Sequence, residues 1–148
     1  MTNVEVLKNL QGQSDEDHRP SDWVPIMYPC WFVEARVFLK RGKNKTEEYE
    51  KSAIICGRTR KFFLADKSKF STEFKGFDKF SLLDRLVTVE QAEELMGTQL
   101  GQLEKSRNRT WIKPEIEIKK SRTVYKIFWY DPLLARLIDS LTGEKVKN

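Results

Sequence analysis

The chain of 148 residues has the length of one domain, and 39% of its residues are hydrophobic against 33% charged. This composition excludes a wholly disordered chain, and no apolar run approaches the ~18 residues of a membrane-crossing helix. The formal net charge is +5 and is unevenly distributed. Residues 1–29 carry 5 acidic and 2 basic side chains, whereas the rest carries 25 Lys and Arg against 17 Asp and Glu, a net of +8. A basic body with an acidic arm is typical of a polyanion-binding protein, although a solvated basic face gives the same composition.

The cysteine and histidine content excludes a zinc site within the chain. Cys30 and Cys56 stand far apart and the single histidine is His18, so four Cys or His ligands are not available. The N-terminus shows no basic stretch followed by an apolar one. We therefore expect two free thiols in a reducing compartment, cytoplasmic or nuclear, and a protein that is not secreted and has no cofactor or metal.

The sequence predicts two regions: a flexible, acidic N-terminal arm over residues 1–22 and a single α+β domain over 23–148. Within the arm, Val4, Leu7 and Leu10 lie three residues apart, which favours a short helix over 2–11. The following stretch to residue 22 lacks large apolar side chains and is typical of a linker. Pro25 and Pro29 predict extended chain before the body of the domain.

Three strands are expected next, over residues 31–41, 47–56 and 60–66. The first alternates strictly, with Trp31, Val33 and Val37 on one face and charged side chains on the other. Short polar turns separate the three runs, so we expect an antiparallel meander.

Residues 67–88 predict one or two irregular helical turns, because Phe70, Phe74 and Phe77 are spaced four and then three apart. A long helix follows to about residue 106, with Thr88 as N-cap and Gln91 completing a capping box. Gly97 and Gly101 either weaken this helix or let another part of the chain approach it closely.

The last elements are predicted as strands over 111–118 and 123–130, separated by a turn of Lys119 to Arg122, and then a C-terminal helix. Asp131 and Pro132 are typical of a helix start and Gly143 of a helix end. The apolar face of this helix would comprise Leu133, Leu134, Leu137, Ile138 and Leu141.

The order of expected elements, β-β-β-α-β-β-α, indicates an α+β fold. A five-stranded OB-like barrel has this order, with its helix between strands three and four, and a plain antiparallel sheet with helices on one face fits nearly as well. This analogy rests on element order alone and says nothing about function.

Two clusters mix basic and aromatic residues, over 58–80 and over 105–130. Single-stranded nucleic acid is bound by cations along its phosphates and by aromatic rings stacked on its bases. We therefore expect a non-enzymatic module that binds single-stranded DNA or RNA. The expected binding residues are Arg58, Arg60, Lys61, Phe63, Lys67, Lys69, Lys113, Lys119, Lys120, Arg122, Tyr125 and Trp129. The opposing interpretation is that these rings are core and these cations only solvate the surface.

The alternative function is a protein-interaction module, namely an assembly subunit, an adaptor or an inhibitor. Such a module would dock an acidic partner through the C-terminal helix, and the protein could be encoded by a virus or phage.

Catalysis is not expected, because the chain has no Gly-rich phosphate loop and no nucleophile elbow. Glu115, Glu117 and Lys119 resemble the strand of metal-dependent nucleases. The upstream Asp that such a site needs is missing, and alternating Glu and Ile is typical of any half-exposed strand.

Overall fold

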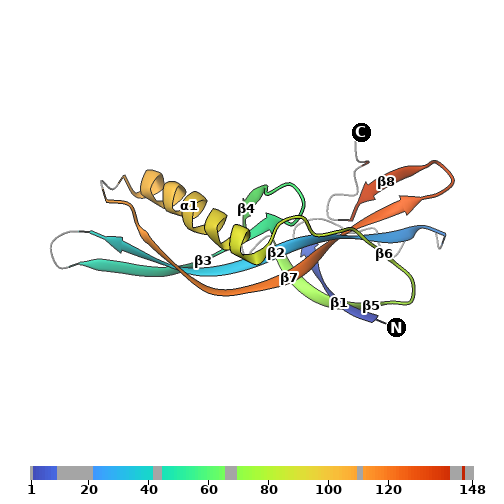
Figure 1. Ribbon diagram of the computed structural model, residues 1–148, viewed down its shortest axis with the longest axis horizontal. Coiled ribbons are helices and arrows are strands. Elements are labelled where there is room, and N and C mark those ends of the chain that lie inside the picture. Colours follow the sequence, from blue (N-terminus) through green and yellow to red (C-terminus); the bar gives the residue numbers. More distant parts are fainter. Residues whose placement is uncertain are drawn as a thin grey trace. The chain divides into compact units, whose positions relative to one another are not determined.

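The computed structural model describes residues 2–9, 22–41, 45–65, 70–109, 112–140 and 145. Within these residues one long helix accompanies a mixed sheet (Figure 1). The elements are β1 (Thr2–Asn9), β2 (Val24–Lys40), β3 (Thr46–Cys56), β4 (Phe62–Leu64), β5 (Phe70–Phe77), β6 (Ser81–Leu82), α1 (Val89–Asn108), β7 (Glu115–Asp131) and β8 (Arg136–Asp139).

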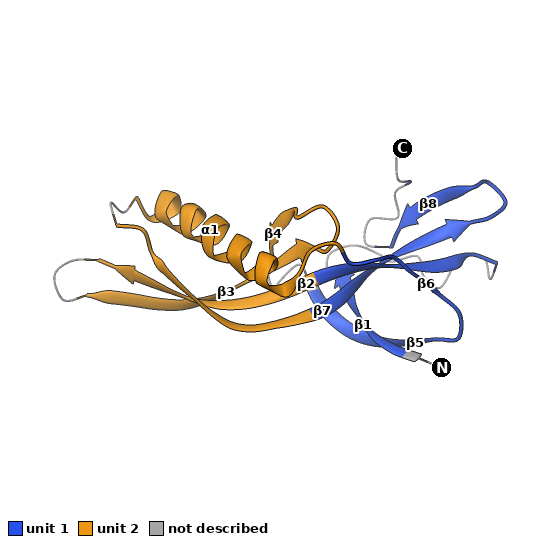
Figure 2. Cartoon of the chain, in the orientation of Figure 1, with its two compact units in different colours: residues 1–30, 66–85, 123–148 blue, residues 31–65, 86–122 orange. Residues whose placement is uncertain are grey.

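The chain divides into two compact units, coloured separately in Figure 2. Unit 1 comprises residues 1–30, 66–85 and 123–148, and unit 2 comprises residues 31–65 and 86–122. Of the expected N-terminal arm, residues 2–9 form a strand, and residues 10–21 lie outside the described part of the chain.

The strands are hydrogen-bonded in the order β4-β3-β2-β7-β1-β5, with β6 beside β2 and β8 beside β7. β1 pairs with β7, and β2 with β6, in parallel, so the sheet is mixed. Among the described strands β4 and β5 each have one neighbour, which leaves the path open. The α+β class is confirmed, but the described strands do not form the expected five-stranded antiparallel sheet or OB-like barrel.

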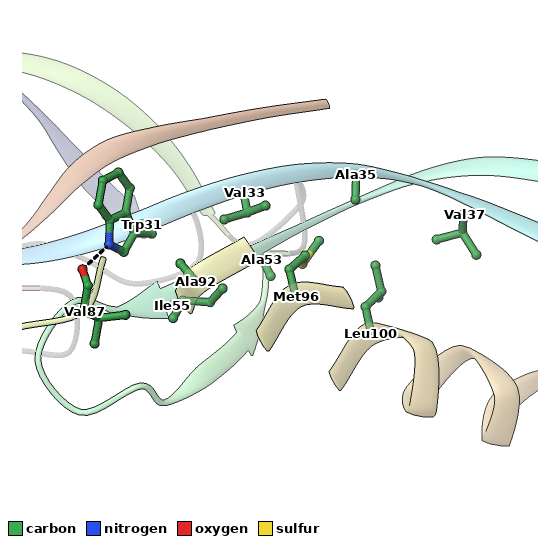
Figure 3. Close-up of a cluster of buried hydrophobic side chains, with 10 residues drawn as sticks. All are labelled: Trp31, Val33, Ala35, Val37, Ala53, Ile55, Val87, Ala92, Met96 and Leu100. Carbon is green, nitrogen blue, oxygen red and sulfur yellow. Dashed lines mark hydrogen bonds between the residues drawn. The ribbon is translucent and has the colours of Figure 1, made fainter. Parts of the chain in front are cut away.

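Unit 2 is built on the strictly alternating strand that the sequence predicts. Trp31, Val33 and Val37 of β2 are buried in one hydrophobic cluster with Met96 and Leu100 of α1 (Figure 3). The indole Nε1 of Trp31 donates a hydrogen bond of 2.8 Å to the carbonyl oxygen of Val87. This bond satisfies the buried indole and anchors the chain that leads into α1.

The predicted helix is confirmed, together with its capping box. The Gln91 backbone N–H donates to Thr88 Oγ1 (3.2 Å), and the Thr88 backbone N–H donates to Gln91 Oε1 (3.0 Å). At the other end Arg109 is left-handed, with φ 50°, and caps the helix. A Cβ on Gly97 would meet nothing within 4 Å, whereas one on Gly101 would lie 2.8 Å from Lys113 Cε.

Two helical predictions in unit 1 are wrong, because both segments are strands. β1 pairs antiparallel with β5 from Thr2↔Phe77 to Asn9↔Phe70. Val6 and Leu7 of β1 are adjacent and both buried, so this strand shows no alternation from which it could be recognised. In β5, Phe77 packs on a core while Phe74 is 74% exposed, which is the two-face pattern of a strand.

The core of unit 1 lies around Val6 of β1, Met27 of β2, and Ile127 and Trp129 of β7. The Phe77 ring lies edge-on to the Trp129 ring, with 6.4 Å between their centroids. Residues far apart in the sequence therefore meet in this core.

The predicted turn from Lys119 to Arg122 is also wrong, since it lies inside the single 17-residue strand β7. Ile118 packs on the core that includes α1, and Ser121 Oγ lies 2.9 Å from Glu93 Oε1 of α1. Lys119 and Lys120 are both exposed, so the alternation of buried and exposed side chains is interrupted at this point of the strand. The polar run therefore lies within a continuous strand and does not end it.

The predicted C-terminal helix is wrong for its described residues, which form the hairpin β7–β8. Asp131 Oδ1 accepts hydrogen bonds from the backbone N–H groups of Leu133 (3.0 Å) and Leu134 (3.4 Å). The same bonding that caps a helix here closes an Asx turn, and Ala135 with φ 49° directs the chain back into β8. Leu141 of the expected helix face lies outside the described residues.

Candidate nucleic-acid interface

The basic charge of the chain belongs to unit 2. Its residues include 16 Lys and Arg against 10 Asp and Glu, a net of +6, whereas unit 1 has 11 against 12, a net of −1. A polyanion is attracted by the local excess of positive charge, so unit 2 is the part of the chain to search for its contacts.

Within unit 2, the turn between β3 and β4 presents three cations on a fixed backbone. The Cys56 N–H donates to the Lys61 carbonyl (2.8 Å), and the Arg60 N–H donates to the Cys56 carbonyl (3.2 Å). Arg60 is left-handed, with φ 63°, which gives the turn its tight reversal. Arg60 and Lys61 are exposed and Arg58 is half-buried.

A second set of hydrogen bonds connects this turn to the segment that precedes α1. The Gly57 carbonyl accepts from the backbone N–H groups of Leu86 (2.8 Å) and Val87 (2.9 Å), just before α1. The Thr59 N–H also contacts Cys56 Sγ at 3.3 Å. The backbone that carries the three cations is therefore held by both β3 and the start of α1, and needs little ordering on binding.

Phe63 adds an exposed aromatic ring beside this turn. It occupies the middle of β4 and is 56% exposed, while its neighbours Phe62 and Leu64 pack against the core of unit 2. A ring between two partly buried neighbours that pack on the core presents its face to solvent, where a base could stack on it. The combination of this ring with the cations of the turn was predicted from the sequence, and the structure holds both on one short hairpin.

Two of the expected binding residues in β7, Lys119 and Arg122, are engaged by neighbouring side chains. Lys119 pairs with Glu117 at 3.0 Å. Arg122 lies over the Phe32 ring, 4.3 Å from its centroid, and 3.7 Å from Glu34. Lys120 and Lys113 are exposed, and Lys113 runs along α1 at Gly101. Contacts of this kind hold the side chains in place and offset part of their charge.

The expected aromatic residues of β7 are poor stacking partners. Trp129 is 4% exposed and belongs to the core of unit 1, and Tyr125 is half-buried against the same core. Lys67 and Lys69 lie outside the described residues. Among the expected binding aromatics, Phe63 is thus the one with an open ring face.

Sequence reasoning missed a buried polar network between α1 and β3. Glu104 is 3% exposed, and its Oε2 accepts hydrogen bonds from Tyr49 Oη (2.6 Å) and Asn108 Nδ2 (3.2 Å). Burial, and then the hydrogen bond to Glu104, raise the pKa of Tyr49 to about 12. Arg41 reaches the same network, because its guanidinium donates to Asn108 Oδ1 at 2.8 Å.

A signal for this network was present in the helix pattern. Ala92, Met96 and Leu100 are buried at four-residue intervals, and the next position is Glu104, while Leu103 is 38% exposed. A carboxylate in line with an apolar stripe indicates a buried polar partner. Tyr49 lies 55 residues away, so the partner itself could not be named from spacing.

The described part of the chain was also compared with the requirements of a metal site and of a membrane-crossing helix. It contains no group of three or more His, Cys, Asp or Glu side chains arranged to hold a metal ion. None of its helices has the length and apolar character that crossing a bilayer requires. Cys30 and Cys56 are both buried and are not joined in a disulfide. No protein-family model, curated protein or solved structure matches this chain.

Proposed function

We propose that unit 2 binds single-stranded nucleic acid without catalysis, through the turn between β3 and β4. Arg58, Arg60 and Lys61 would contact phosphates, and the Phe63 ring would stack on a base. The observation that carries this proposal is the 56% exposure of Phe63 directly after an anchored turn of three cations. An exposed aromatic ring offers a face on which a base can stack.

The free energies expected for stacking and for phosphate contacts are large enough to give measurable binding. A base stacked on an aromatic side chain contributes about 1–3 kcal/mol, and each phosphate contact releases counterions from the strand. With three cations and one ring, binding should be of modest affinity, dependent on salt and little dependent on sequence.

The test is a fluorescence-anisotropy titration with a labelled single-stranded oligonucleotide at low and high salt. Arg60→Glu with Lys61→Glu should weaken binding at least tenfold, because two cations that attract phosphate are replaced by two anions that repel it. The matched control reverses Lys79, an exposed cation of unit 1, to Glu and should leave the affinity unchanged. If the wild-type protein does not bind at low salt, the proposal is wrong.

The role of the ring is tested separately from that of the charges. Phe63→Tyr keeps an aromatic face and should retain the affinity within about twofold. Phe63→Leu keeps an apolar side chain but removes the ring, and should weaken binding by roughly 5- to 160-fold, since stacking contributes about 1–3 kcal/mol. Equal affinities for the two variants would show that Phe63 does not stack on a base.

The second cluster is tested by Lys119→Glu with Lys120→Glu. If this pair weakens binding more than the reversal at Arg60 and Lys61, the interface lies along β7. If neither pair alters binding, both surfaces are excluded.

A protein-interaction module is the second candidate, and one observation favours it. Leu133 and Leu134, at the tip of the β7–β8 hairpin, are 84% and 59% exposed. Two exposed leucines on an anchored turn suit an apolar pocket on another protein. Leu133→Ser with Leu134→Ser should leave nucleic-acid binding intact, and the absence of any nucleic-acid binding would make this second candidate the leading one.

A further inference from the structure

The strand β5 ends the path of paired strands with one edge open. β1 pairs with it along its whole length, and no other described strand pairs with its far edge. The backbone N–H and C=O groups of that edge can accept another strand. β5 belongs to unit 1, so it shares no residue with the proposed nucleic-acid interface in unit 2.

The side chains of β5 alternate between two faces. Glu73 and Lys75 lie opposite Val6 and Val4 of β1, on the face that also carries Phe77 and the core of unit 1. Phe74 lies on the other face, opposite Glu5, and is 74% exposed. The order along the strand is thus an acid, an exposed ring and a base.

This order is complementary to itself when the strand is reversed. We propose that β5 pairs antiparallel with β5 of a second copy of the chain, with Phe74 on the two-fold axis. In this register Glu73 lies opposite Lys75 of the partner subunit, and Lys75 opposite Glu73 of the partner subunit. Both charge pairs fall on one face, and the two Phe74 rings meet on the other.

The charges explain why the partner is a second copy and not any extended chain. A lysine on an edge strand normally prevents pairing, because an incoming strand would bury it without a counter-charge. Here Lys75 already lies 3.4 Å from Glu73 of its own strand. A second copy supplies a further carboxylate at each lysine, whereas an uncharged strand does not, so Lys75 favours pairing with a second copy.

The contact is small, so the dimer should be weak. One strand pair buries less than the ~1,200–2,000 Å² of a stable interface. We therefore expect a dissociation constant of roughly 10⁻⁵–10⁻³ M.

Sedimentation equilibrium over a range of micromolar to millimolar concentrations tests the association. The average mass should rise from that of the 17.5 kDa monomer towards twice that value. Lys75→Glu should weaken association at least tenfold, because carboxylates then face each other. Adding Glu73→Lys restores opposite charges and should restore the dimer, while the control Lys79→Glu should change nothing.

The register is tested by cross-linking. Phe74→Cys should form an intermolecular disulfide under mild oxidation, because the two substituted residues meet at the axis. Thr72→Cys, on the same face two residues away, should not, because Thr72 lies opposite Gly76 of the partner subunit. A monomer at every concentration, a charge swap that fails to restore association, or equal cross-linking of both variants would overturn the proposal.

Discussion

Tyr49 and Glu104 form a short polar contact that joins β3 to α1. The Tyr49 hydroxyl donates to Glu104 Oε2 at 2.6 Å, and Asn108 donates to the same oxygen. Glu104 Oε1 is buried and has no hydrogen-bond partner among the described residues. A buried carboxylate with so few donors depends strongly on each of them.

Tyr49→Phe should therefore lower the free energy of unfolding by about 1–3 kcal/mol, the range for leaving a buried polar group unsatisfied. Urea denaturation at pH 7 measures the change. Tyr130→Phe is the control, since Tyr130 is half-buried on β7 away from this network. Equal effects of the two substitutions would contradict the importance of the Glu104 contact.

The raised pKa of Tyr49 has a consequence at high pH. Because its pKa is about 12 in the folded protein against 10.0 ordinarily, folding favours the neutral hydroxyl. The stabilisation is fully present below pH 10 and is lost as the pH rises towards 12. Denaturation between about pH 8 and 11.5 should show a steeper loss of stability for the wild-type protein than for Tyr49→Phe, and parallel curves would refute this linkage.

At the scale of elements, α1 carries two glycines with different surroundings. A Cβ at Gly97 meets nothing within 4 Å, so Gly97→Ala should stabilise the protein by about 0.5–1 kcal/mol through helix propensity and backbone entropy. At Gly101 a Cβ would displace the flexible end of Lys113, so the gain should be smaller. Thermal unfolding of both variants checks the order, and destabilisation by Gly97→Ala would show that the space is not open.

The β7–β8 hairpin depends on one buried carboxylate. Asp131 is 4% exposed, closes the turn through Leu133 and Leu134, and pairs with Arg136 at 3.2 Å. Asp131→Ala should cost about 1–3 kcal/mol and speed hydrogen exchange in β8. Asp131→Asn keeps the Asx turn and should have a smaller effect, and unchanged exchange in the alanine variant would mean that the turn forms without this side chain.

The elements that the sequence predicts correctly are those with one buried face. β2 and α1 alternate or repeat cleanly, because one side meets the core and the other meets solvent. β1 has buried side chains on both faces, and in β7 the alternation is interrupted at Lys119 and Lys120, which are both exposed. The two-residue period of a strand is therefore not visible in either sequence. Asp131 was misinterpreted because helix caps and Asx turns use the same bonds.

The part of the candidate site that is formed by residues close together in the sequence could be predicted. Arg58 to Phe63 follow Gly57 in a short connection, and local sequence suffices to place cations and a ring together there. The exclusion of Trp129 as a stacking residue could not be foreseen, because its burial depends on Val6 and Met27, which are distant in sequence.

At the scale of the whole molecule, the division of charge gives a quantitative expectation. If three cations of the β3–β4 turn contact phosphates, log K should fall with log salt with a slope of about −2 for a single strand. Raising salt from about 50 to 200 mM would then weaken binding roughly 20-fold. Anisotropy titrations at several salt concentrations measure the slope, and a slope near zero would mean that the basic charge of unit 2 does not contact phosphate.

The interleaving of the two units along the chain bears on the order in which they fold during synthesis. All residues of unit 2 lie between positions 31 and 122, whereas unit 1 joins the first strand to the last segment, as at Val6↔Tyr125. A growing chain can therefore assemble the helix-covered core before residues 123–140 exist, but β1 must wait for its β7 neighbour. Until then β1 can pair with β5 along one edge, while the edge that pairs with β7 stays open on the nascent chain and is available to a strand of another molecule.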